Sequence, residues 1–148
     1  MAIITVEDVA LRLAVALLVA AIFGINRNLH HRAAGVRTLT LVALATCGLV
    51  LAVLDATHSS PDAISRTIQG IVSGIGFIGA GVILHRESSI QVQGLTTAAM
   101  VWFVAALGIL AGLGQFMLIG LISGFGFVGL LLGRPLERLF YGVFDRPE

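Results

Sequence analysis

Several residue types that a soluble protein needs are scarce or missing in this chain. The 148 residues include no lysine, and only 11% of them are charged, against roughly 25% in an average soluble domain. The nine basic residues are all arginines, and they form no basic stripe of the kind that tracks nucleic-acid phosphates. We therefore expect no nucleic-acid partner. A single cysteine, Cys47, excludes an intrachain disulfide and a cysteine metal site.

Hydrophobic residues take the place of the missing polar ones. They make up 57% of the chain, and its mean hydropathy is +1.02. Backbone groups in lipid need internal partners, so apolar runs of membrane length must be helices. The sequence predicts an all-α polytopic transmembrane bundle within residues 1–133, with the lipid bilayer as its partner. Its five spans are Val9–Ile25, Thr38–Leu54, Ile68–Leu84, Leu95–Leu113 and Phe116–Leu132.

Charges at the ends of the spans predict the orientation. Seven of the nine arginines fall on one side of a five-span chain, and the other side has four acids, Glu7, Asp8, Asp55 and Asp62, with only Arg12 and Arg66 near it. The positive-inside rule then places the N-terminus outside and the C-terminus in the cytoplasm of a bacterial inner membrane. The N-terminus has no basic region, so we expect the first span to be retained rather than cleaved. Ser60-Pro61-Asp62 predicts the start of the third helix.

Residues 134–148 form a short tail after the last span. Leu136, Leu139, Phe140, Val143 and Phe144 recur at helical spacing on one face. This pattern predicts an amphipathic helix on the cytoplasmic leaflet. The alternative is a frayed continuation of the fifth span.

A glycine-rich pattern occurs twice, once in the third span and once in the fifth. Residues 70–79 and 120–129 share G-x-x-S-G-x-G-F-x-G, and weaker matches precede both copies. The pattern predicts two parallel helical hairpins, spans two–three and four–five, with the first span outside the repeat. Each copy contains G-x-G-x-x-G, but inside an apolar span, which excludes a dinucleotide site.

Small residues allow helices to approach closely in lipid. One interpretation is that they pack the spans of one chain together, and the other is that one face remains for a second copy. The pairs at 70/74, 108/112, 120/124 and 129/133 all have G-x-x-x-G spacing. The predicted packing residues are Gly70, Ser73, Gly74, Gly76, Gly79, Gly120, Ser123, Gly124, Gly126 and Gly129.

Residues able to carry catalysis are poorly placed. The four histidines lie at span ends or in loops, and neither H-E-x-x-H nor G-x-S-x-G occurs, so we expect no enzyme and no cofactor. Asp55, His58 and Asp62 are a weak metal signal, because two acids seven residues apart across a loop are more typical of structure. We predict no metal site.

Polar residues at the span ends suggest two clusters. On the outer side, Arg12 and Arg66 either pair with Asp8 and Asp62 four residues before them or meet Asp55 in a polar cluster. On the inner side, two helix N-termini favour an anionic group, such as a lipid phosphate or a partner's carboxylate. The alternative there is capping by threonine. The inner residues are Asn26, Arg27, Arg37, Thr38, Thr96 and Thr97.

These motifs resemble the MgtC/SapB family of bacterial membrane proteins. The resemblance is carried by Ala34–Thr38, Ser65–Gly70, Ser73–Gly81 and Gly94–Ala99 with Trp102. It adds Gln69 and Trp102 to the candidate binding residues. Asn26 stands where the family pattern has glutamate, and Leu39 where it often has histidine.

The resemblance implies an association with magnesium homeostasis, growth in low magnesium and virulence. Two functions remain open. One is a regulator that binds other membrane protein complexes, and the other is a transporter or channel for an ion or small solute. Few polar residues occur within the spans, which favours the regulator. We also expect a homodimer through the third or fifth span.

Overall fold

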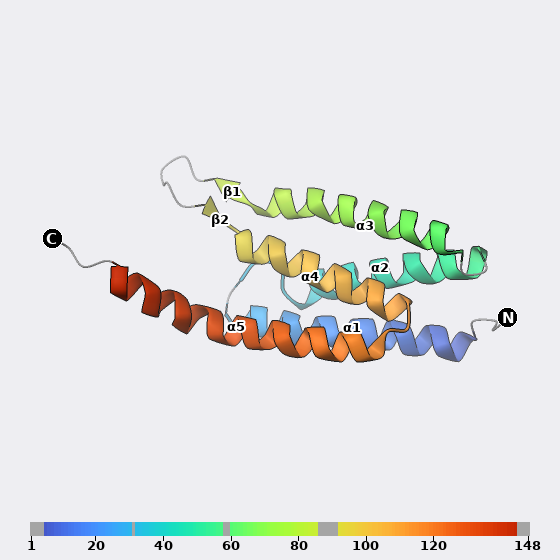
Figure 1. The fold of residues 1–148 in the computed structure, drawn as a ribbon, viewed down its shortest axis with the longest axis horizontal. Helices are drawn as coiled ribbons and strands as arrows, with labels where there is room; N and C mark the ends of the chain where they lie inside the picture. The colour runs from blue at the N-terminus through green and yellow to red at the C-terminus, as the bar shows by residue number, and fades with distance from the viewer. Residues whose placement is uncertain (1–4, 31, 58–59, 86–91, 145–148) are drawn as a thin grey trace.

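The fold is a bundle of five helices in a computed structural model that describes residues 5–30, 32–57, 60–85 and 92–144. Figure 1 shows the helices side by side, each antiparallel to the one before it in sequence, with the start of α1 and the end of α5 at opposite ends. A short antiparallel pair, β1 and β2, joins α3 to α4. The bounds are α1 Val6–Leu29, α2 Val36–Ala56, α3 Pro61–Val82, β1 Leu84–His85, β2 Val92–Gln93, α4 Leu95–Gly112 and α5 Phe116–Phe144.

Four of these helices are long and apolar enough to cross a membrane, namely α1, α2, α4 and the part of α5 up to Gly133. The remaining helix, α3, is equally long but carries Asp62, Arg66 and Gln69 in its first half. These polar residues lower its hydropathy, although it lies alongside the others (Figure 1). The chain is therefore an all-helical membrane protein.

Helix boundaries differ from the apolar runs mainly where polar residues extend a helix. The predicted start of the third helix is confirmed, because α3 begins at Pro61 after Ser60, although the Ser60 side chain makes no capping hydrogen bond. The tail does not begin a separate helix. Instead α5 continues through Pro135 to Phe144 as one helix, in line with the alternative of a continued fifth span, and residues 145–148 lie outside the described chain. The position of this tail on the cytoplasmic leaflet stays a prediction.

The centre of the bundle is the contact between α2 and α4. Gly108 and Gly112 of α4 lie against the α2 backbone, where an added Cβ at Gly108 would be 2.5 Å from the carbonyl oxygen of Ala43. At Gly112 it would be 2.9 Å from the carbonyl oxygen of Cys47. Ala43 and Cys47 are fully buried. This G-x-x-x-G pair therefore allows two central helices to touch backbone to backbone.

Helix α5 is held at the edge of the bundle by aromatic contacts. The ring of Phe127 meets Phe23 of α1 edge-to-face at 6.1 Å, and Phe23 meets Phe103 of α4 at 5.2 Å. Gly126 lies so close to the Phe103 ring that a Cβ there would clash. Only 6% of the apolar window of α5 is buried, so most of this helix faces outward.

At most of the predicted packing glycines, an added side chain would touch nothing in the part of the chain that the structure describes. An added Cβ would meet nothing within 4 Å at six of the ten predicted packing positions, and it would make only an ordinary contact at Gly79. The side chain of Ser73 is exposed, whereas Ser123 is partly buried. The interpretation that this set packs one chain together is therefore wrong at Gly70, Gly74, Gly76, Gly120, Gly124 and Gly129.

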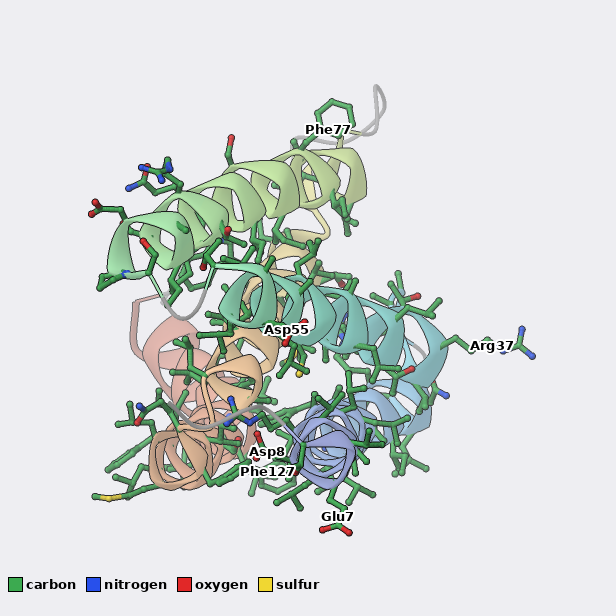
Figure 2. All side chains as sticks on the ribbon, turned by 90° about the vertical axis from the view of Figure 1, so that its right-hand side faces the viewer. Glu7, Asp8, Arg37, Asp55, Phe77 and Phe127 are labelled. Carbon is green, nitrogen blue, oxygen red and sulfur yellow. The ribbon has the colours of Figure 1, made fainter. Side chains whose placement is uncertain are left out.

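The two copies of the glycine-rich pattern are consequently used differently. Phe77 of α3 is 84% exposed and points away from the bundle in Figure 2, whereas its counterpart Phe127 packs inward. Figure 1 shows α2 parallel to α4 and α3 parallel to α5. That geometry is compatible with parallel hairpins, but the contacts of the two copies are not equivalent.

Candidate functional site

The most unusual side chain in the bundle is Arg27, a cation that is only 4% exposed near the C-terminus of α1. Its Nη2 donates hydrogen bonds to the backbone carbonyl of Ala33 at 2.9 Å and to the hydroxyl of Thr97 on α4. Thr97 is buried as well. Because an unpaired buried charge is costly, these contacts fix the guanidinium between α1, α4 and the loop that leads to α2.

That loop folds back onto the end of α1. The backbone amides of His30 and Arg32 both donate to the carbonyl of Arg27, at 3.2 and 3.1 Å. Nδ1 of His30 donates to the backbone carbonyl of Asn26 at 2.7 Å. The αL conformation of Ala34, with φ of 57°, completes the turn. Two further basic side chains are thus held beside Arg27.

A cavity of about 290 Å³ opens at this end of the bundle. It lies between the end of α1, the start of α4 and the second half of α5. We call it the basic pocket. Its lining residues are Asn26, Arg27, His30, Arg32, Thr96, Gly129, Leu130, Leu131 and Gly133.

The predicted inner cluster is only partly brought together. Asn26, Arg27, Thr96 and Thr97 meet at the basic pocket or beside it, but Arg37 and Thr38 are exposed on α2. Figure 2 shows Arg37 extending away from the bundle.

Threonine capping, the alternative interpretation, is wrong. Gly35 and Gly94 occupy the N-cap positions of α2 and α4, and neither helix has a side-chain capping hydrogen bond. Thr97 instead accepts a hydrogen bond from Arg27.

At the opposite end of the bundle, Arg12 joins α1 to the C-terminus of α4. Its Nη2 pairs with Asp8 at 2.8 Å, and its Nη1 donates to the backbone carbonyl of Gly112 at 2.6 Å. The guanidinium therefore satisfies one of the carbonyls that every helix C-terminus leaves without an intrahelical partner. The role of this arginine is a structural contact between helices.

The remaining candidates do not gather into a site. Asp55 and Arg66 are exposed, and Arg12–Asp8 is the one ion pair between described residues. Gln69 donates only to Ser65 at 3.3 Å, and Trp102 is 49% exposed. His58, part of the weak metal signal, lies outside the described residues. No three His, Cys, Asp or Glu side chains come together in the parts of the chain that the structure describes.

Sequence reasoning missed His30, Arg32 and Gly133 as pocket residues. The signal that could have found them is the basic cluster that directly follows the first span, where His30 and Arg32 lie three and five residues after Arg27. Gly133 could not have been placed from sequence, because its position depends on how α5 crosses the end of α1.

Comparison with known proteins places this architecture in a family. The MgtC family pattern matches residues 13–139. The chain is 42% identical over 139 residues to protein SrpB of Synechococcus elongatus, which covers 86% of this chain and 76% of SrpB. It is 45% identical over 106 residues to protein MgtC of Salmonella typhimurium, covering 72% of this chain and 44% of MgtC.

A third relative, protein SapB of Bacillus subtilis, is 36% identical over 114 residues, which covers 72% of this chain and 48% of SapB. The chain thus spans less than half of MgtC and SapB. No solved structure matches it. On the length of the family match and the identity to these relatives, the chain belongs to the MgtC family.

Proposed function

We propose that this protein is a regulator in the adaptation to low magnesium and that it acts by binding other membrane proteins. The observation that carries the proposal is the open glycine face on α3 and on α5. At Gly70, Gly74, Gly120 and Gly124 nothing in the described chain lies within 4 Å of an added Cβ. Glycine faces of this kind allow a partner helix to approach closely in lipid.

The interior of the bundle supports binding over transport. Of the described residues, the buried polar side chains are Arg27, Thr46 and Thr97. Arg27 and Thr97 bond to each other at one end, and the Thr46 hydroxyl donates to the carbonyls of Val42 and Ala43 in its own helix, both at 3.1 Å. A conduction path needs polar groups through the middle of the membrane.

A second copy of the chain is the first partner that we propose for these faces. Closed two-fold pairing is the commonest arrangement of identical subunits. Large apolar side chains flank the glycines on both helices, with Phe77 84% exposed on α3 and Phe125 77% exposed on α5. A homodimer through either helix would cover them.

The placement in the membrane is also part of the proposal. Five crossings, with α3 as the third, are supported by the alternating directions of the helices, which leave the start of α1 and the end of α5 at opposite ends of the bundle (Figure 1). With the arginine distribution, this gives an inner-membrane protein whose C-terminus is cytoplasmic. The parallel directions of the hairpins α2–α3 and α4–α5 support an origin by duplication.

Crosslinking tests the interaction surface. After Cys47→Ala, single cysteines placed along residues 70–81 and 120–133 should crosslink between copies with helical periodicity on α3 or on α5. Single cysteines placed along α1, at residues 6–29, serve as the control. A monomeric mass in native mass spectrometry, with no periodic crosslinks in membranes, would refute the dimer.

A flux assay and a growth assay test the rest. Liposomes that contain the purified protein should show no more Mg²⁺ or monovalent-cation flux than empty liposomes, and a robust flux would establish the transporter instead. In a bacterium that lacks its own MgtC-family protein, the chain should restore growth at low magnesium. Gly74→Leu and Gly124→Leu should abolish that rescue without lowering the amount of protein in the membrane, and unimpaired rescue by both would contradict the binding role.

A further inference from the structure

We propose that the basic pocket binds the phosphate headgroup of an anionic phospholipid and that an acyl chain of this lipid lies in the groove between α4 and α5. This inference is independent of the proposed function, because it rests on the basic residues at the end of α1 and on the groove beside Gly129, and not on the partner-binding faces at Gly70, Gly74, Gly120 and Gly124.

The charge of the pocket selects an anion. Two arginines and a histidine line it, and the lining residues that the structure describes include no carboxylate. Arg27 forms a fixed charge, since its Nη2 is already held by Ala33 and Thr97. Arg32 and His30 are exposed and tied by their backbone amides to the end of α1. Basic pockets between transmembrane helices are typical headgroup sites.

The start of α4 adds donors to the same place. Its N-cap residue is Gly94, which supplies no side-chain capping bond, and Thr96 in its first turn lines the pocket. The first amides of a helix lack intrahelical partners and carry a partial positive charge. They therefore reinforce the attraction that the arginine side chains exert on a phosphate group.

The pocket continues into an apolar groove, which is why a lipid fits better than a free anion. A second cavity of about 220 Å³ shares Thr96, Gly129 and Leu130 with the basic pocket. Its other walls are apolar and include Met100 and Phe103 of α4. A free phosphate would use only the first cavity, whereas a phospholipid matches the polar cavity with its headgroup and the apolar one with its chain.

Gly129 is the structural reason that the groove exists. It lines both cavities, and nothing in the described chain lies within 4 Å of an added Cβ. A side chain at this position would therefore project into the groove without disturbing the bundle. A larger residue at position 129 therefore tests what blocking the groove does to lipid binding in a protein that is still folded.

The experiment measures lipid binding to the detergent-solubilised full chain by native mass spectrometry. The probes are dioleoyl phosphatidylglycerol, dioleoyl phosphatidylcholine and inorganic phosphate. Phosphatidylglycerol should remain bound preferentially. Arg32→Gln should weaken that binding about five-fold, the effect of one basic residue near an anionic headgroup. Its matched control is Arg37→Gln, which removes an exposed arginine at the same end of the bundle but outside the pocket.

A second variant pair tests the groove. Gly129→Leu should reduce phosphatidylglycerol binding at least as strongly as Arg32→Gln. Gly48→Leu, at an equally open glycine of α2 that lines neither cavity, should leave it unchanged. Helical circular dichroism and gel filtration establish that each variant is folded.

Three results would overturn the proposal. The first is equal retention of the anionic and zwitterionic lipids, which would mean that the pocket does not select lipids by the charge of the headgroup. The second is equal loss in the two arginine variants, which would mean that only the overall charge of the surface matters. The third is binding of inorganic phosphate that survives Gly129→Leu without any preference for phosphatidylglycerol, which would assign the pocket to a soluble anion.

Discussion

Replacing Gly108 with alanine tests the central contact of the bundle with a single methyl group. The new Cβ would lie 2.5 Å from the carbonyl oxygen and 3.0 Å from the Cα of Ala43, and it would clash with the hydroxyl of Thr46. Two of these obstacles are backbone atoms of α2, so no rotamer change relieves the overlap. The two helices must separate, and the packing between fully buried side chains along the contact must loosen.

The expected cost follows from two opposing effects. Overpacking a well-packed core costs about 1–3 kcal/mol, and alanine regains roughly 0.8–1.0 kcal/mol of helix propensity relative to glycine. Because backbone atoms of α2 cannot move aside as a side chain could, the upper part of the overpacking range applies, about 2–3 kcal/mol, and we expect a net destabilisation of about 1–2 kcal/mol. Gly48→Ala is the matched control, because nothing lies within 4 Å of its added Cβ. That variant should gain up to about 1 kcal/mol from helix propensity.

Thermal unfolding in a mild detergent, followed by circular dichroism, measures both variants. A change of this size in Gly108→Ala should lower the midpoint by roughly 2–8 °C, while Gly48→Ala should raise it or leave it unchanged. A Gly108→Ala protein as stable as the unmodified chain would refute the close contact between α2 and α4. An equal loss in both variants would show that alanine acts through the helix itself and not through the neighbouring backbone.

Three further predictions follow from individual contacts. Arg12→Ala removes the bond to the α4 carbonyl and should lower the free energy of unfolding by about 1–3 kcal/mol. The control Arg66→Ala, at an exposed position, should change it by less than about 0.5 kcal/mol. Equal effects of the two variants in denaturant titration would contradict a structural contact between Arg12 and α4. Thr97→Val deprives buried Arg27 of an acceptor and should lower the free energy of unfolding by about 1–3 kcal/mol. Thr97→Ser keeps the hydroxyl and should retain most of the stability. A Val variant as stable as the Ser variant would exclude this hydrogen bond. Trp102, 49% exposed on a membrane-length helix, should be quenched by brominated lipids and not by aqueous iodide, and the reverse pattern would place this side of α4 in water.

Hydropathy and the residues that begin and end helices determined the membrane class, the helical fold and most helix boundaries. These depend on local chemistry, because an apolar run in lipid has to satisfy its own backbone hydrogen bonds. The Ser60-Pro61 start of α3 is predictable for a similar reason, since proline at the first helical position loses no hydrogen bond. The sequence left the tail open between a separate helix and a continuation of the fifth span, because local signals at Pro135 favour a break, and the structure shows the continuation.

The roles of the glycines depend on which helices become neighbours, and only the tertiary structure decided that. Gly108 and Gly112 share their spacing with Gly120 and Gly124, yet the first pair touches the backbone of α2 and the second meets nothing in the described chain. A G-x-x-x-G pair indicates that another helix can approach closely, but it does not determine which helix does so.

The candidate site was likewise only half visible in the sequence. Arg27, Asn26 and Thr97 were recognisable as polar groups at span ends, but the separation of Arg37 from them depends on the angle at which α2 leaves the loop. Arg27 and Thr97 are 70 residues apart, and the lining from α5 comes from beyond residue 128. Local chemistry supplied the charges of the basic pocket, and the packing of three helices at one end of the bundle turned them into a cavity.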